Sequence, residues 1–149
     1  MTLLLKNLQK IVQINLKDIS YDINKIRKII GVSHLNLAVL CVDNDYIKYL
    51  NKTYRNDDRI TDVISFPQLE NLVNYPIVNN DECLGDIFLA LPYIQERAKS
   101  NFNKEIQILV IHGICHLIGF NHTDDKSHEE MVCLEDFIMN QFCKDKQII

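Results

Sequence analysis

The chain has 149 residues, of which 47% are hydrophobic and 24% are charged, and its formal net charge is −4. This length and composition suit a single globular domain over residues 1–149 and exclude collagen-like, disordered and disulfide-framework proteins. A membrane span is not expected, because the longest apolar stretch, residues 106–120, is interrupted by polar residues and is shorter than the roughly 20 residues that a bilayer requires. The five cysteines are scattered without a C-x-x-C pair, which favours free thiols and a cytoplasmic location.

The predicted elements follow from hydrophobic periodicity and from turn and capping residues. Residues 1–17 are apolar and ambiguous, with a strand favoured. Asp43 and Ser127 are expected to cap helices, and Gly31 is expected to end one. In chain order the sequence predicts a strand within 1–17, a helix at 21–30, a strand at 35–42, a helix at 43–54, a strand at 61–66, a loop at 69–83, a strand at 84–90, and helices at 92–100, 104–119 and 127–142.

Strands concentrate in the first two thirds of this order, and helices dominate the remainder. That distribution is typical of an α+β fold, in which helices pack on one sheet. We therefore expect one small α+β domain with a mixed sheet of about four strands and about five helices.

Three of the five histidines lie in the segment HGICHLIGFNH. His112 and His116 are four residues apart on a predicted helix, so both imidazoles point in the same direction. Gly119 can adopt the left-handed conformation that ends a helix, and the chain can then return His122 to the same point. Three nitrogen ligands leave a fourth tetrahedral position open, as in a catalytic zinc site. Cys115 is turned away from this face and is expected to be a buried apolar residue.

The spacing of these histidines is also that of the metzincin peptidases, which carry a glutamate as general base directly after the first histidine. Here that position is Gly113, which has no side chain. A peptidase, or another zinc hydrolase, would need a base from elsewhere, and Asp62, Asp86 and Glu82 are the candidates. The sequence therefore favours a phosphodiester substrate, whose negative charge is attracted to a metal.

A cluster of cations precedes the predicted strand at 61–66. Arg55 ends the second predicted helix, and an arginine in a metal site can neutralise charge on a phosphate. Lys52 and Arg59 lie nearby and are candidate contacts to the phosphates of such a substrate. The alternative is a helix-end cation favoured by the helix dipole and paired with Asp57 or Asp58. Residues 1–59 carry ten basic and six acidic side chains, which allows a local basic face in an acidic protein.

Three blocks of the sequence follow one another in this order: LNKTYRNDDRITDVISFP, LGDIFLALP, and HGICHLIGFNHTDD followed by EEM and LEDFIM. Together they resemble the YbeY family of bacterial metal-dependent endoribonucleases. The resemblance implies an α+β fold with one zinc per chain, held by His112, His116 and His122. It implies cleavage of single-stranded RNA, a role in maturing the 3′ end of small-subunit ribosomal RNA and in ribosome quality control, and ribosomal particles or ribosome-associated proteins as partners. Arg55 matches the arginine that the family uses in its active-site cleft.

The chain departs from the family pattern H-G-x-L-H-L-x-G-Y-D-H at three positions. Cys115 and Phe120 replace a leucine and a tyrosine, which packing tolerates. Asn121 replaces an aspartate, which removes a charge that could orient a metal ligand.

Two questions stay open at the level of sequence. The nucleophile is either a water, which is slightly favoured, or the 2′-hydroxyl of the RNA itself, which DNA lacks. The protein could also be a non-catalytic ribosome-assembly factor whose zinc is structural.

Overall fold

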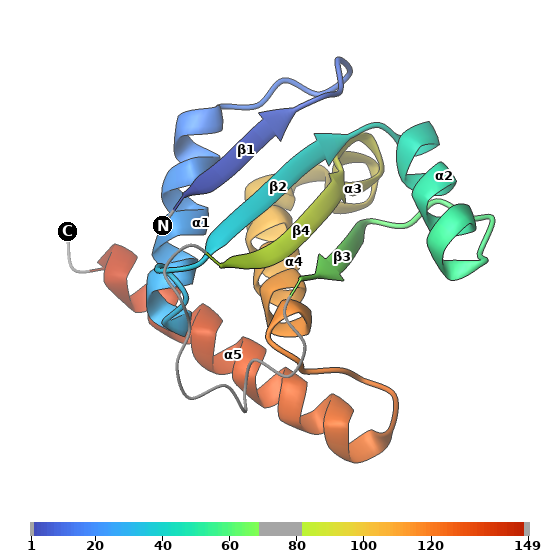
Figure 1. The fold of residues 1–149 in the computed structure, drawn as a ribbon. Helices are drawn as coiled ribbons and strands as arrows, with labels where there is room; N and C mark the ends of the chain where they lie inside the picture. Colours follow the sequence, from blue (N-terminus) through green and yellow to red (C-terminus); the bar gives the residue numbers. More distant parts are fainter. Residues whose placement is uncertain (1, 69–81, 148–149) are drawn as a thin grey trace.

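A four-stranded sheet lies at the centre of the protein (Figure 1). The computed structural model describes residues 2–68 and 82–147. In spatial order the strands are β1 (Leu3–Asn7), β2 (Asn36–Val42), β4 (Cys83–Ala90) and β3 (Val63–Pro67). β1 and β4 run parallel to β2, and β3 runs antiparallel to β4. The predicted α+β class with a mixed sheet is confirmed.

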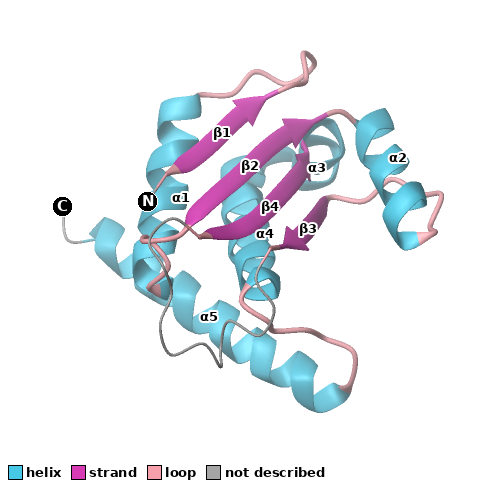
Figure 2. Cartoon of the chain, in the orientation of Figure 1, coloured by secondary structure: helices cyan, strands magenta, loops and turns pink. Residues whose placement is uncertain are grey.

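Helices surround this sheet in the described residues (Figure 2). None of these helices combines the length and the apolar character that would let it cross a membrane. They are α1 (Leu16–Ile30), α2 (Asn44–Arg55), α3 (Leu91–Ala98), a short 3₁₀ turn at Lys99–Asn101, α4 (Phe102–Leu117) and α5 (Asp125–Gln147).

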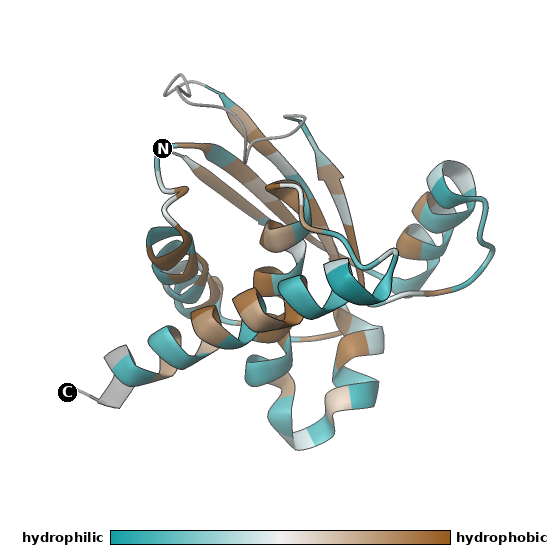
Figure 3. Ribbon diagram, turned by 90° about the horizontal axis from the view of Figure 1, so that it is seen from below, coloured by the Kyte–Doolittle hydropathy of each residue, from teal (hydrophilic) through white to brown (hydrophobic). Residues whose placement is uncertain are grey.

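The two faces of the sheet have different partners because side chains alternate along a strand. In β2, Leu37, Val39 and Cys41 are buried in the main core, together with residues of α1, α4 and α5. The alternate residues Leu40 and Val42 belong to a second, smaller cluster that is built with α2. Figure 3 shows hydrophobic residues concentrated on the strands and on the helix segments beside them. The sheet therefore has one fully covered face and one face on which α2 packs.

The prediction of a strand within residues 1–17 holds only for Leu3–Asn7. After that strand the chain turns around Gln9, a buried residue whose side chain donates to the Val12 carbonyl and accepts from the Val12 amide. Asn15 then caps α1 by accepting from two backbone amides, so the helix begins at Leu16 and not at residue 21. The side-chain hydrogen bonds of these two residues override the apolar pattern.

Other boundaries differ by a few residues. Asp124 caps α5, where Ser127 had been predicted to do so. The Asp124 carboxylate accepts from the Ser127 amide at 2.7 Å, and the Ser127 hydroxyl accepts from the Asp124 amide at 3.2 Å, which is the reciprocal arrangement of a capping box. Most of the loop predicted at 69–83 lies outside the described residues, although Cys83 belongs to β4.

Candidate functional site

Helix α4 carries the first two histidines of the motif on a face beside the sheet. The helix approaches the sheet closely at Gly113: a Cβ atom there would lie 2.9 Å from Ile87 Cδ1 and 3.0 Å from Ser65 Oγ. Glycine at this position therefore allows α4 to pack against β3 and β4. Consequently His112 and His116, one residue before and three after this contact, are half-buried beside the edge strand β3.

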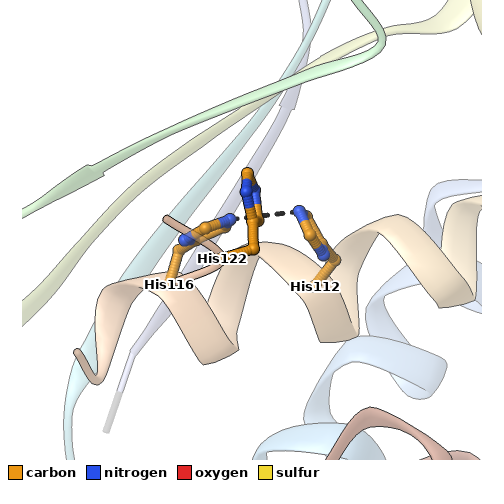
Figure 4. Close-up of side chains that lie close together, drawn as sticks. All are labelled: His112, His116 and His122. Atoms are coloured by element: carbon orange, nitrogen blue, oxygen red, sulfur yellow. Dashed lines mark hydrogen bonds between the residues drawn. The ribbon is translucent and has the colours of Figure 1, made fainter. Parts of the chain in front are cut away.

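A tight turn after α4 returns the third histidine to the first two. Gly119 has a φ of 108°, as its predicted helix-ending role requires. The Gly119 amide donates to the His116 carbonyl and the Phe120 amide donates to the Cys115 carbonyl, both at 3.0 Å. Figure 4 shows the result, with the side chain of His122 pointing toward the two histidines of α4.

The three imidazoles form a set that fits a metal ion. One ring nitrogen from each of His112, His116 and His122 lies within 4.8 Å of the others. The Nε2 atoms of His112 and His116 are 3.1 Å apart. Two nitrogens that bind one zinc at ordinary bond lengths with a tetrahedral angle are about 3.4 Å apart. The donor set therefore matches a small divalent cation that prefers nitrogen ligands.

The second nitrogen of each helical histidine has its own partner. His112 Nδ1 lies 3.2 Å from Glu135 Oε2, and His116 Nδ1 lies 3.0 Å from the Phe120 carbonyl oxygen. A carbonyl oxygen only accepts, so Nδ1 of His116 carries the proton and its Nε2 lone pair faces the other imidazoles. The Glu135 carboxylate likewise accepts from His112 Nδ1, so the proton of that ring is on Nδ1 and the lone pair is on Nε2. Both rings are thus held in the tautomer that a metal needs.

Glu135 is a site residue that sequence reasoning did not single out. It lies on α5, 23 residues from the histidine that it contacts. Its neighbours along the helix, Met131 and Ile138, are both buried. A carboxylate four residues from one and three from the other lies on the buried face, and this spacing is the signal that could have identified it.

The environment of His116 keeps its imidazole neutral. Burial is the main cause that lowers its pKa to about 4, and the nearby charges of His112, His122 and Arg55 lower it further. The hydrogen bond to the backbone carbonyl of Phe120 acts in the opposite direction. At neutral pH the Nε2 lone pair of His116 is therefore available to a metal.

The structure places the three predicted cations at the end of α2 and in the loop after it. Arg55 is the last residue of that helix, is exposed, and makes no hydrogen bond or salt bridge with any described residue, although its charge reaches His116. Arg59 is held by Asp57 through two hydrogen bonds of 2.7 Å. Lys52 lies 3.9 Å from Asp58, with both side chains exposed. Of the three, Arg55 is the cation associated with the histidines.

Two of the three acidic residues that could supply a peptidase base are engaged or turned away from the histidines. Asp62 pairs with Arg97 and also accepts from the Val63 amide. Asp86 alternates with Ile87, so it lies on the sheet face opposite α4. The third candidate, Glu82, is half-buried just before β4.

The remaining motif residues have structural roles. Cys115 is fully buried, and burial raises the pKa of its thiol to about 12, in agreement with the expectation of an apolar core residue. Asn121 Oδ1 accepts from the Thr123 hydroxyl at 3.0 Å within the turn. Among the described residues, a carboxylate contacts a histidine of this set from α5, where Glu135 lies 3.2 Å from His112.

Comparison with known proteins identifies the family to which this constellation belongs. A sequence model of the family described as Endoribonuclease YbeY matches residues 4–143. The chain belongs to the YbeY family. Among curated members, the human Endoribonuclease YbeY is 35% identical over 147 residues, which cover 95% of this chain and 88% of the human protein. The Endoribonuclease YbeY of Staphylococcus epidermidis is 36% identical over 111 residues, with 71% and 72% of the two chains covered.

A solved structure has a similar fold. The solution structure of a Thermotoga maritima protein superimposes with a TM-score of 0.62 at 27% sequence identity, covering 98% of this chain and 92% of that one. The YbeY match begins within β1 and ends within α5, so it includes every residue of the candidate site.

Proposed function

We propose that this YbeY-family protein is a zinc-dependent, single-strand-specific endoribonuclease that acts in the cytoplasm, in 3′-end maturation of small-subunit ribosomal RNA and in ribosome quality control. The endoribonuclease class, a hydrolase of RNA phosphodiester bonds, follows from family membership. The observation that carries the rest is the convergence of three imidazoles beside an arginine that makes no salt bridge with any described residue. Its partners would be single-stranded ribosomal RNA and ribosomal particles.

In this proposal His112, His116 and His122 hold one zinc ion. When bound, the metal supplies a Lewis acid that polarises a phosphoryl oxygen of the substrate. Two hydrogen-bond acceptors orient the histidines that would hold the metal. The Glu135 carboxylate orients His112, and the Phe120 carbonyl orients His116. Three protein ligands leave the substrate side of the site open.

Arg55 is the proposed catalytic cation. Its planar guanidinium can donate two parallel hydrogen bonds to a phosphate. Because the side chain is exposed and forms no salt bridge with any described residue, it does not have to break one to reach the substrate. Lys52 and Arg59 are proposed to contact the RNA backbone, with Arg59 held in place by Asp57.

Two other hypotheses make different predictions. A zinc peptidase needs a general base, and Gly113 provides none at the position that peptidases use. A ribosome-assembly factor with a structural zinc needs no open ligand position, whereas the set of three nitrogens favours an open one. The structure therefore gives more support to the nuclease than to either alternative.

The test is cleavage of a labelled single-stranded RNA, with the duplex form of the same RNA in parallel. We expect the zinc-loaded protein to cut only the single strand. Arg55→Ala should lower the rate about 10²–10³-fold, since it removes a charge that stabilises the transition state, and His116→Ala should abolish cleavage. Lys28→Ala, an exposed cation in the last turn of α1, serves as the matched control and should cut at the wild-type rate.

Equal cleavage by all four proteins would point to a contaminating nuclease and contradict the proposal. A folded protein that binds ribosomal particles but cuts no RNA would favour the assembly factor. The product ends would identify the nucleophile, because attack by the 2′-hydroxyl leaves a 2′,3′-cyclic phosphate and attack by water does not.

A further inference from the structure

Five aromatic side chains form one continuous surface on the side of the sheet that α2 covers. Tyr54 contacts Phe66 with ring centroids 5.2 Å apart, and Phe66 contacts Phe88 at 5.7 Å. Phe88 in turn contacts Tyr46 at 6.1 Å, and Tyr46 contacts Tyr49 at 6.3 Å. We call this set of five residues the aromatic surface. It joins three elements, since its tyrosines come from α2 and its phenylalanines from β3 and β4.

The aromatic surface is open to solvent at its tyrosines. Tyr46, Tyr49 and Tyr54 are 43%, 59% and 65% exposed, and both phenylalanines are partly exposed. Tyr21 on α1 is equally exposed, at 65%, but it contacts no other ring in the described residues. A single exposed tyrosine needs no explanation, whereas a connected series of rings marks a binding surface.

This surface begins next to the candidate active site. Tyr54 directly precedes Arg55, whose charge reaches His116. On β3, Ser65 faces Gly113 of α4, and the adjacent Phe66 points to the opposite face of the strand. The edge strand β3 therefore separates the histidines on one side from the aromatic rings on the other. α2 and β3 lie side by side at the end of the sheet in Figure 1.

Exposed cations of α2 can attract a polyanion beside these rings, and one of them, Lys52, also lies 3.9 Å from Asp58. Among the residues of α2 are the cations Lys48, Lys52 and Arg55, against one acidic side chain, Asp45. All four are exposed. Flat aromatic faces next to exposed cations are the combination with which proteins bind single-stranded nucleic acid, since the rings stack on bases and the cations attract phosphates.

We propose that the aromatic surface stacks the bases of the single-stranded RNA substrate on the side of β3 away from the histidines, with the RNA backbone passing Arg55. This inference rests on the proposed function. It adds a surface that binds the RNA at nucleotides other than those at the cleaved bond. It also supplies a physical reason for single-strand specificity: bases in a duplex are already stacked inside the helix and cannot lie on protein rings.

Binding of RNA without cleavage gives the direct test. The probe is a fluorescein-labelled oligoribonucleotide of about 12 nucleotides, a length in the range of a single-strand-binding site, and affinity is read by fluorescence anisotropy in the His116→Ala background. Tyr46→Leu and Tyr49→Leu keep apolar bulk but remove the flat ring. We expect each to weaken binding about five- to tenfold, as the loss of one stacked base would. Tyr49→Phe keeps the ring and should bind within about twofold of its parent.

Two controls separate stacking from other effects. Tyr21→Leu removes an equally exposed but isolated tyrosine and should leave the affinity unchanged. An oligonucleotide of the same length with abasic sugars retains the phosphates but offers nothing to stack, so Tyr49→Leu should not change its affinity. Thermal unfolding of each variant confirms that the fold is retained.

The outcomes distinguish this inference from the proposed function. If the protein binds RNA and the leucine variants bind it equally well, the inference fails and the nuclease proposal stands. The aromatic surface would then have to serve a protein partner. Equal weakening toward normal and abasic strands also overturns the inference, because stacking would not be the cause. If no RNA binds to the wild type or any variant, the proposed function fails and this inference fails with it.

Discussion

At the scale of single residues, the site is organised by the partners of the histidines as much as by the histidines themselves. His112 and His116 each have one nitrogen in the shared space and the other on an acceptor. The Phe120 carbonyl comes from the turn that follows α4, and the Glu135 carboxylate comes from α5. An imidazole that lacked its acceptor would be free to rotate and to adopt the other tautomer, so these acceptors set the geometry that a metal meets.

Glu135 provides the first prediction. Glu135→Ala removes the acceptor at His112 Nδ1 and should lower the affinity for zinc about 10–100-fold, because outer carboxylates fix the ring and raise its basicity. The measurement is competition for zinc with a chelating dye, which requires no RNA.

The matched control is Glu130→Ala, which removes an exposed carboxylate from the same helix and should bind zinc with wild-type affinity. Wild-type affinity in Glu135→Ala as well would mean that the contact at 3.2 Å does not orient the ligand.

At the scale of elements, α4 has two roles at neighbouring positions. It packs closely on the sheet, and it places its histidines beside the edge strand. Gly113 allows the close packing, because Ile87 and Ser65 occupy the space that a side chain would need. Gly113 also occupies the position at which a metzincin carries its general base. Glycine at this one position therefore both permits the close packing of the helix and leaves the protein without that base.

Packing at this helix supplies the second prediction. Gly113→Ala should lower the free energy of unfolding by up to about 2 kcal/mol, because overpacking costs about 1–3 kcal/mol and the gain in helix propensity returns about 1 kcal/mol. Urea unfolding followed by circular dichroism measures this change.

Asn140→Ala is the control for helix propensity alone, since Asn140 is exposed on α5 and its substitution should be neutral or slightly stabilising. A Gly113→Ala protein more stable than the wild type would mean that the sheet yields to the extra methyl group, and it would contradict the close-packing argument.

These elements also show what sequence can predict and what it cannot. The spacing of His112, His116 and His122 predicted their convergence, because helix period and a left-handed glycine are local properties. Glu135 could not be assigned in the same way, since its contact depends on how α5 crosses α4. Likewise the apolar residues before Asn15 suggested one long strand, and two side-chain hydrogen-bonding residues produced a turn and a cap.

At the scale of the whole molecule, the candidate site draws on elements that meet only in the folded state. α4 and the turn after it supply the imidazoles, α5 supplies Glu135, and α2 brings Arg55 close enough for its charge to reach His116. No short segment contains all of these groups. A ligand that needs them together therefore binds the native state in preference to the unfolded chain, and its binding free energy adds to stability.

This linkage gives the last prediction, which concerns metal removal. With free zinc at about 100 times its dissociation constant, the native state gains about 2.7 kcal/mol, which for a chain of this size corresponds to a rise in Tm of about 5–10 °C. Excess chelator should reverse that rise. His122→Ala should lose most of it, because His122 joins the turn after α4 to the helix through the metal, whereas His34→Ala, which changes a partly buried histidine outside the site, should retain it in full. If zinc raised the Tm of His122→Ala as much as that of the wild type, the ion would bind elsewhere, and the three imidazoles would not be its ligands.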